Sequence, residues 1–160
     1  MPGYVAPHNG SIPPHILVTT LSPDIFMINE SSRKAIIFEL TCPWDLNVQR
    51  SHTCKEEKYA PLVADLARHY SVYHFSVEVS VRGQISKENK ARLKAFVYRS
   101  CDTPGKLAGK MVKDCSKAAL LSSFSLLRSE GAVMVGPAPI DFSITYLVRF
   151  SFVVRYRERR

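Results

Sequence analysis

The sequence predicts an α/β domain in which a mixed β-sheet lies between helices, and three consecutive segments carry this prediction. Residues 34–41 are almost continuously apolar, as in a strand that is buried on both faces. Residues 48–70 then repeat apolar side chains at helical spacing, and residues 72–81 alternate as a strand does. A long helix between two strands is typical of a crossover that leaves the strands parallel. With 160 residues, 46% of them hydrophobic, the chain is long enough to bury one core.

The segment before the buried strand is predicted to be an irregular arm followed by two short strands. Residues 1–14 are rich in proline and glycine, which disfavour helix and strand. Residues 15–20 and 24–28 have the composition of strands, and the turn-forming residues 29–32 lead into the buried strand. We therefore expect an antiparallel meander at the start of the domain.

The helix predicted after Pro43 has one apolar face and one internal proline. Its apolar residues recur three and four positions apart, at Tyr59, Leu62, Val63, Leu66, Ala67 and Tyr70. Pro61 removes one backbone hydrogen bond, so we expect it to kink this helix or to begin a second segment. The strand that follows is expected to end at Arg82 and Gly83.

Two further helices are predicted at 86–100 and 104–122. The second carries four lysines at steps of four, three and four residues, which places them along one face: Lys106, Lys110, Lys113 and Lys117. A solvated face of an ordinary surface helix is the favoured interpretation, and contact with phosphates is the alternative. The chain thus divides into an arm (1–14), a core (15–100), a helical extension (101–130) and a divergent tail (131–160), in which alternating apolar residues predict a strand.

Composition narrows the possible partners. A net charge of +8 and a pI near 9.5 favour an anionic partner, either nucleic acid or an acidic membrane surface. The four cysteines include no CxxC pair, so His69 and His74 do not predict a zinc finger. We expect reduced thiols in a nuclear or cytoplasmic protein. With no signal-peptide pattern and no apolar segment of about 18 residues, we expect neither secretion nor a membrane span.

Two acidic residues, Asp24 and Glu39, lie in apolar segments from which hydrophobic packing alone would exclude a charged side chain. A buried carboxylate must be paired, hydrogen-bonded or bound to a metal. A hairpin brings Asp24, at the start of one strand, close to Glu39, late in the next. Two carboxylates, with the backbone carbonyl of Leu40, are the oxygen ligands that Mg²⁺ prefers. This combination suggests metal-dependent cleavage of a phosphodiester.

Such a site also needs a cation near the attacking water and the scissile phosphate. A strand-borne lysine two residues after Glu39 would point to the same side, but Thr41 occupies that position. The nearest candidates are Lys55 and Lys58 on the helix, and Lys58 is preferred because it borders the apolar face. Structural roles remain open for each residue alone: Asp24 as a turn or cap residue, Glu39 as a buried ion-pair partner, and Lys58 as a surface side chain with its stem on apolar neighbours.

Several ordered motifs resemble the restriction-endonuclease-like segment that follows the reverse transcriptase in certain non-LTR retroelements. They are Leu21-Ser-Pro-Asp-Ile, Ala35-Ile-Ile-Phe-Glu-Leu-Thr-Cys-Pro-Trp-Asp, Lys55-Glu-Glu-Lys-Tyr-Ala-Pro-Leu-Val and Val77-Glu-Val-Ser-Val-Arg-Gly. With a further motif, Cys115-Ser-Lys-Ala-Ala-Leu-Leu-Ser-Ser-Phe-Ser, the resemblance covers roughly residues 14–122. The resemblance implies the PD-(D/E)xK nuclease fold and Mg²⁺-dependent cutting of DNA, with Mn²⁺ as an alternative metal.

The resemblance also assigns residues to roles. Asp24 and Glu39 match the two metal-binding acids, Thr41 occupies the lysine position, and Lys58 is similar to the lysine that some members supply from the next helix. Lys55, Glu78 and Arg82 are expected beside the site without a fixed role. Candidate DNA contacts are Lys87, Lys90, Lys94, Lys106, Lys110, Lys113 and Lys117.

Two departures from the family pattern leave alternatives open. The family has a helix before its first strand, which residues 1–14 do not predict, and no reverse transcriptase is present in the chain. The chain therefore resembles an isolated piece of a retroelement or a host protein derived from one. A catalytically inactive DNA-binding module and a remnant without activity are the alternatives to an endonuclease.

Overall fold

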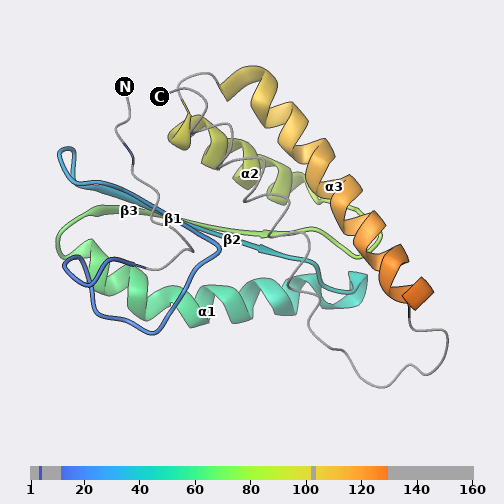
Figure 1. Ribbon diagram of the computed structural model, residues 1–160, viewed down its shortest axis with the longest axis horizontal. Coiled ribbons are helices and arrows are strands. Elements are labelled where there is room, and N and C mark those ends of the chain that lie inside the picture. Colours follow the sequence, from blue (N-terminus) through green and yellow to red (C-terminus); the bar gives the residue numbers. More distant parts are fainter. Residues whose placement is uncertain (1–3, 5–11, 102–103, 130–160) are drawn as a thin grey trace.

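The computed structural model describes residue 4 and residues 12–101 and 104–129 of the chain. Within these residues a sheet of three strands lies between helices, which confirms the predicted α/β class (Figure 1). In chain order the elements are β1 (Ile25–Asn29), β2 (Lys34–Thr41), the short 3₁₀ helix η2 (Asp45–Asn47), α1 (Val48–Ala67), β3 (Ser71–Glu78), α2 (Lys87–Ser100) and α3 (Pro104–Ser129).

The sheet is mixed, with β2 at its centre. β1 pairs antiparallel with β2, and β3 pairs parallel with β2 across the α1 crossover, as predicted. The turn between β1 and β2 is held by Asn29, whose Oδ1 accepts hydrogen bonds from the Ser31 hydroxyl (2.8 Å) and the Ser32 amide (2.9 Å). Side-chain capping of this kind fixes the hairpin register, which places Ile25 opposite Phe38.

The expected meander is wrong in its first strand. Residues 15–20 are a turn and irregular chain, because the carbonyl of Pro13 accepts hydrogen bonds from the amides of Ile16 (2.9 Å) and Leu17 (3.2 Å). That local closure withdraws both amides from any ladder. The apolar residues Ile16 and Leu17 of this segment lie instead against the apolar cluster between α1 and the sheet, while Val18 is exposed.

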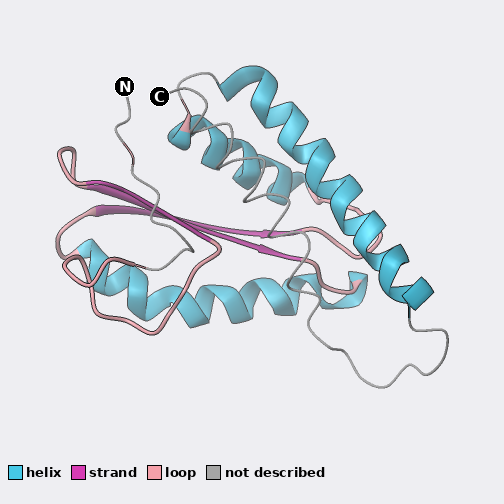
Figure 2. Cartoon of the chain, viewed as in Figure 1, coloured by secondary structure: helices cyan, strands magenta, loops and turns pink. Residues whose placement is uncertain are grey.

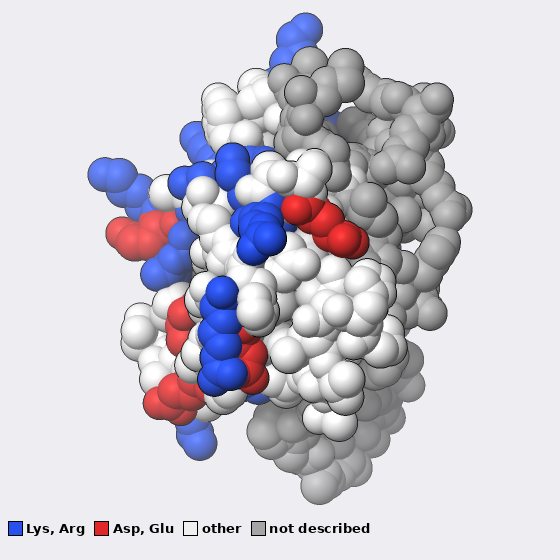
Figure 3. All heavy atoms as spheres, turned by 90° about the vertical axis from the view of Figure 1, so that its left-hand side faces the viewer, with Lys and Arg blue, Asp and Glu red and all other residues white. Residues whose placement is uncertain are grey.

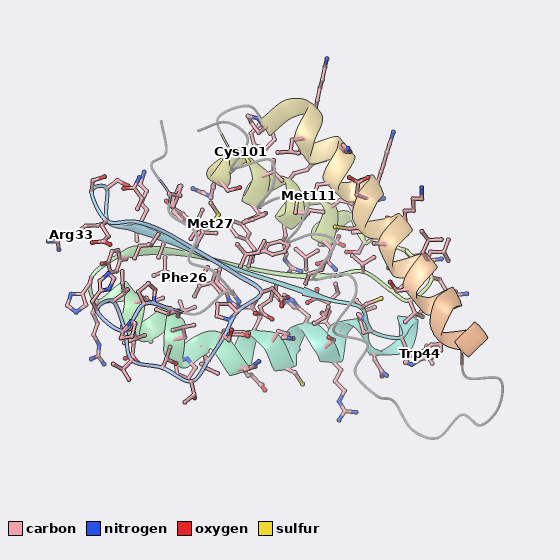
Figure 4. The ribbon with its side chains drawn as sticks, in the orientation of Figure 1. Phe26, Met27, Arg33, Trp44, Cys101 and Met111 are labelled. Carbon is pink, nitrogen blue, oxygen red and sulfur yellow. The ribbon has the colours of Figure 1, made fainter. Side chains whose placement is uncertain are left out.

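Helices cover both faces of the sheet, α1 on one side and α2 with α3 on the other (Figure 2). Successive residues of β1 serve the two sides: Phe26 packs towards α1 and Met27 towards α2 and α3 (Figure 4). Because both faces of β2 are covered, its residues from Ala35 to Leu40 are all buried. This double burial is the reason that the strand reads as a nearly continuous apolar run.

α1 is one helix despite its internal proline. Pro61 lies within Val48–Ala67, so of the two expected alternatives the beginning of a second segment is wrong. Position 61 is exposed, and water can therefore replace the hydrogen bond that the proline removes. The other predicted helices are confirmed, with α3 running to Ser129. Ser86 is the N-cap of α2, and its hydroxyl accepts a hydrogen bond from the amide of Asn89 (3.1 Å).

β3 ends at Glu78, three residues earlier than predicted. The amides of Val79 and Val81 still bond to the carbonyls of Thr41 (2.9 Å) and Pro43 (3.1 Å), but Pro43 has no N–H with which to continue the ladder. The chain then turns at Gly83, whose φ is 74°. A Cβ there would lie 2.6 Å from the carbonyl oxygen of Ser116, so only glycine lets this turn approach α3.

Several sequence predictions concern residues that the structure does not describe, among them the tail strand within 131–160 and most of the arm within 1–14. Of the arm, Tyr4 and Ile12 are buried against the domain. None of the four cysteines forms a disulfide with another described residue. None of the described helices is long and apolar enough to span a membrane.

Candidate active site

The interface between α1 and the sheet has an apolar half and a polar half. In the apolar half, Tyr59, Leu62 and Leu66 of α1 pack on the apolar side chains of the sheet. The buried residues of this half are Ile12, Phe26, Ile28, Ala35, Ile37, Tyr59, Leu62 and Leu66. Side chains alternate along a strand, so Glu39 and Thr41 follow Ala35 and Ile37 on the same face. The pattern therefore turns polar towards the carboxyl end of β2.

The neighbouring strand turns polar at the same level. Ser76 is the register partner of Glu39, and Glu78 is the register partner of Thr41. Three contacts then cross to the first turns of α1: Ser51 Oγ to Thr41 Oγ1 (3.3 Å), His52 Nδ1 to Glu78 Oε1 (3.1 Å) and Lys55 Nζ to Glu39 Oε2 (3.0 Å). These residues and Asp24 are called the polar half below.

Asp24 and Glu39 lie side by side at the edge where β1 begins. Glu39 is 1% exposed, and its Oε1 accepts a hydrogen bond from the backbone amide of Asp24 (2.8 Å). Asp24 Oδ2 in turn accepts from the amide of Leu40 (2.9 Å). Each acid thus binds the backbone beside the other. Because the register sets Ile25 opposite Phe38, the hairpin itself brings the preceding residue, Asp24, to Glu39.

The carbonyl of Leu40 faces this same edge. The carbonyl of Thr41 points to β3, where it accepts from Val79, so the backbone groups of the preceding residue, Leu40, point to the β1 side. The donor set at the edge is therefore two carboxylates and one carbonyl, all oxygen, which fits Mg²⁺. No group of three or more His, Cys, Asp or Glu that could hold a metal occurs among the described residues. An ion held by this set would need water or substrate oxygens as its other ligands.

Lys55, and not Lys58, reaches the acid pair. Tyr59 points inward, and its hydroxyl donates to the carbonyl of Ser22 (3.1 Å). Lys55 lies four residues before Tyr59 and therefore on the same face of α1. Lys58 is next to Tyr59 in the sequence and is turned about 100° from it around the helix axis. Lys58 is exposed, with its Nζ 3.2 Å from the Tyr59 hydroxyl. In the sequence, the four-residue step from Lys55 to Tyr59 indicates that Lys55 faces the sheet. The position of Lys58 next to Tyr59 is a weaker indication, because neighbouring residues of a helix point in different directions.

Glu78 is a second buried acid of the polar half. Its Oε1 accepts from the Ser76 hydroxyl (2.9 Å) and faces His52 Nδ1, while its Oε2 is buried, without a hydrogen bond among the described residues, 4.0 Å from Arg92 Nη1. Asn89 Nδ2 donates to the Glu78 carbonyl (3.0 Å) and fixes the backbone. Sequence reasoning placed Glu78 near the site but missed His52, although His52 lies three residues before Lys55 on the same helix face.

His74 completes the layer between β3 and α1. Its Nδ1 is 3.5 Å from Glu56 Oε2, and its Nε2 is buried without a hydrogen bond among the described residues. Burial lowers the pKa of His74 below its ordinary value, and the carboxylates of Glu56 and Glu39 oppose that shift. The imidazole is therefore kept neutral at physiological pH.

The remaining predicted residues lie outside this layer. Arg82 is exposed and pairs with Asp45. The predicted DNA-contacting lysines of α2 and α3 are all exposed, and both helices cover the opposite face of the sheet from α1. Lysine and arginine side chains at the end of the molecule with the β1–β2 turn are interspersed with acidic and uncharged ones (Figure 3).

Comparisons of the chain with protein-family models, curated proteins and solved structures find no match. Function must therefore be inferred from the polar half itself. Its chemistry combines an acid pair with oxygen ligands for a hard cation, an ammonium group beside that pair, and a histidine held by a buried carboxylate. This set of groups is suited to hydrolysis of a charged ester.

Proposed function

We propose that this chain is a Mg²⁺-dependent DNA endonuclease domain of the PD-(D/E)xK type, related to those of non-LTR retroelements. One observation carries the proposal: the buried Glu39 binds the backbone of Asp24 on one side and Lys55 on the other, at a sheet edge that the Leu40 carbonyl also faces. The resemblance implies two acids followed in the chain by a lysine, and here they are Asp24, Glu39 and Lys55. The lysine comes from α1, because Thr41 fills the strand position.

In this proposal Asp24, Glu39 and the Leu40 carbonyl would hold the ion. Mg²⁺ would supply Lewis acidity there and favour deprotonation of a water. Lys55 is 18% exposed, so its ammonium can face both Glu39 and an incoming phosphate, and it stabilises the negative charge that develops on the phosphoryl oxygens. The oxygen of water bonds to phosphorus, the bond to the leaving oxygen breaks, and that oxygen takes up a proton.

Nucleic acid as the substrate is supported by charge. The chain carries +8 overall, and the exposed lysines of α2 and α3 add positive potential away from the acids. Such contacts position a duplex without reading its sequence. The proposal therefore specifies DNA as the polymer and leaves sequence preference to be measured.

A nicking assay on supercoiled plasmid tests this function. The parent protein with Mg²⁺ is expected to nick, and Asp24→Asn and Glu39→Gln are expected to lose at least about 100-fold in rate. Lys55→Met is expected to lose about 10²–10³-fold, as for removal of one group that stabilises transition-state charge. Lys58→Met, one turn along the same helix, is the matched control and is expected to nick like the parent.

Two results would contradict the proposal. One is a parent protein that is folded by circular dichroism yet nicks with neither Mg²⁺ nor Mn²⁺. The other is nicking that survives in Asp24→Asn and Glu39→Gln, which would indicate a contaminating nuclease. An equal loss of nicking rate in the Lys55 and Lys58 variants would contradict the proposed role of Lys55. It would not contradict the proposed role of Asp24 and Glu39.

A second candidate, an inactive DNA-binding module, is favoured by the way the acids are used. The reciprocal bonds of Asp24 and Glu39 to backbone amides fasten β1 to β2 whether or not a metal binds. DNA binding without cleavage would then depend on the α3 lysines. Replacing Lys106, Lys110, Lys113 and Lys117 by glutamine is expected to reduce the slope of log affinity against log salt by up to about 3–4.

A further inference from the structure

We propose that His52 is a proton-transfer residue of the same site and that Glu78 is the residue that positions it. This inference rests on the proposed endonuclease function and adds a group that neither the acid pair nor Lys55 supplies. It starts from the His52–Glu78 contact, which is the second of the three contacts from α1 to the sheet.

The environment of Glu78 determines the tautomer of His52. An ionised carboxylate only accepts hydrogen bonds, and Glu78 Oε1 already accepts from Ser76. The 3.1 Å contact with His52 Nδ1 therefore requires the ring proton to be on Nδ1. Neutral His52 consequently carries its lone pair on Nε2, which is the atom that can take a proton from water.

The ring is also in the right place. His52 and Lys55 are three residues apart on one helix face, with Cβ atoms about 5–6 Å apart. Beneath them, Ser76 and Glu39 are register partners on adjacent strands. Glu78 lies two residues beyond Ser76 on β3, so the His52–Glu78 pair is the diagonal neighbour of the Lys55–Glu39 pair. The His52 side chain keeps 18% of its surface exposed, so the ring lies between the buried acid and solvent.

His74, in the same layer, shows what a merely structural histidine looks like. Its Nε2 is buried and its Nδ1 faces Glu56 at the helix surface, so it has no accessible nitrogen to offer a substrate. The charged groups around His52 are Glu78 on β3, Arg92 on α2, Lys55 and Glu56 on α1, Glu39 on β2 and, when protonated, His74. Of these, Glu78 is the one in contact with the ring.

The chemical step is a general-base hydrolysis. Nε2 of His52 takes a proton from water as the water oxygen bonds to phosphorus, and the bond from phosphorus to the leaving oxygen breaks. The leaving oxygen takes a proton from solvent and becomes a hydroxyl, and the imidazolium returns its proton to solvent. Glu78 stabilises the imidazolium through Nδ1–H and keeps the ring oriented.

Chemical rescue separates this role from a structural one. His52→Ala is expected to nick plasmid about 100-fold more slowly than the parent under single-turnover conditions with Mg²⁺, and added imidazole is expected to restore part of the rate. The pH profile of the nicking rate is expected to differ between the parent and His52→Ala, because only the parent has the proposed proton-transfer group. Glu78→Gln is expected to slow nicking and change the pH profile. His69→Ala, an exposed histidine beyond the end of α1, is the matched control.

The outcomes distinguish this inference from the function on which it rests. If the parent nicks and His52→Ala nicks equally fast, or if imidazole restores nothing, the inference is overturned and the endonuclease function stands. If the parent does not nick, both fall. Long-range ¹H–¹⁵N NMR of the DNA-free parent gives an independent reading: neutral His52 is expected as the Nδ1–H tautomer, and the Nε2–H tautomer would overturn the inference whatever the activity.

Discussion

The two halves of the interface between α1 and the sheet use the same helix and the same strands for opposite purposes. In the apolar half, Leu62 and Leu66 pack on Ile37 and its neighbours without directional contacts. In the polar half, Glu39 and Glu78 are equally buried but each is fixed by hydrogen bonds of about 3 Å. Burial of a leucine stabilises the fold by about 1.5–3 kcal/mol, whereas a buried ion pair contributes little net stability.

Folding of the apolar half holds the charged groups of the polar half together. α1 is a single rigid element that spans both halves, so packing of Tyr59, Leu62 and Leu66 fixes where His52 and Lys55 must lie. Charged side chains left to themselves would remain in water. Substitutions in the polar half are therefore expected to change the free energy of unfolding less, and the nicking rate more, than substitutions in the apolar half.

The largest effect on stability is expected in the apolar half. Leu62→Ala removes a side chain that is 2% exposed, and it should lower the free energy of unfolding by about 2–5 kcal/mol because it leaves a cavity. Urea denaturation followed by circular dichroism measures this loss. Nicking per folded molecule should stay unchanged, and a small change in stability would show that this half does not dominate the fold.

A smaller loss is expected when the ion pair is broken on one side. Lys55→Met leaves Glu39 buried and charged, and should destabilise by about 1–3 kcal/mol, with water reaching the partly exposed site. The double variant Glu39→Gln with Lys55→Met carries no unpaired charge and should be more stable than Lys55→Met alone. A double variant that loses the sum of both single effects would contradict this account of the polar half.

His74 should make the stability of the polar half depend on pH. The pKa of His74 is lowered in the folded protein, so the unfolded chain binds more protons as the pH falls through about 6.5. The contribution of His74 to stability is thus complete above that pH and is lost progressively towards the folded-state pKa. Urea midpoints measured at about pH 7.5 and 5.5 check this prediction. The midpoint of the parent should fall more on acidification than the midpoint of His74→Gln.

The smallest effect is expected at Lys58. Lys58→Met changes an exposed side chain on the same helix and should alter the free energy of unfolding by no more than about 0.5 kcal/mol. Measured beside Lys55→Met, it isolates the contact with Glu39 as the variable, because both substitutions remove a lysine. A loss as large as that of Lys55→Met would mean that the ion pair with Glu39 does not account for the effect of Lys55.

The sequence predicted the order and type of most elements because the signals were local. The two-sided burial of β2 gave an apolar run, the α1 face gave three- and four-residue spacing, and the crossover gave a parallel third strand. The failure at residues 15–20 arose because Pro13 closes a local turn. Composition records that Ile16 and Leu17 are apolar but not whether their amides enter a ladder.

The candidate site was predictable in its acids and less so in its partners. Asp24 and Glu39 are conspicuous because they interrupt apolar segments, and hairpin geometry brings them together. Lys55 required the exact rotation of α1 relative to Tyr59, and His52 required the register of β3 against β2. Both depend on how elements far apart in the chain are set against one another.

The sequence alone thus determined an α/β domain with two acids in a buried hairpin, since burial, periodicity and turn chemistry act over a few residues. Only the tertiary structure decided which lysine meets Glu39 and that a histidine meets Glu78. The physical reason is that a helix face is selected by packing: Tyr59, Leu62 and Leu66 set the rotation of α1, and that rotation points Lys55 inward and Lys58 to solvent.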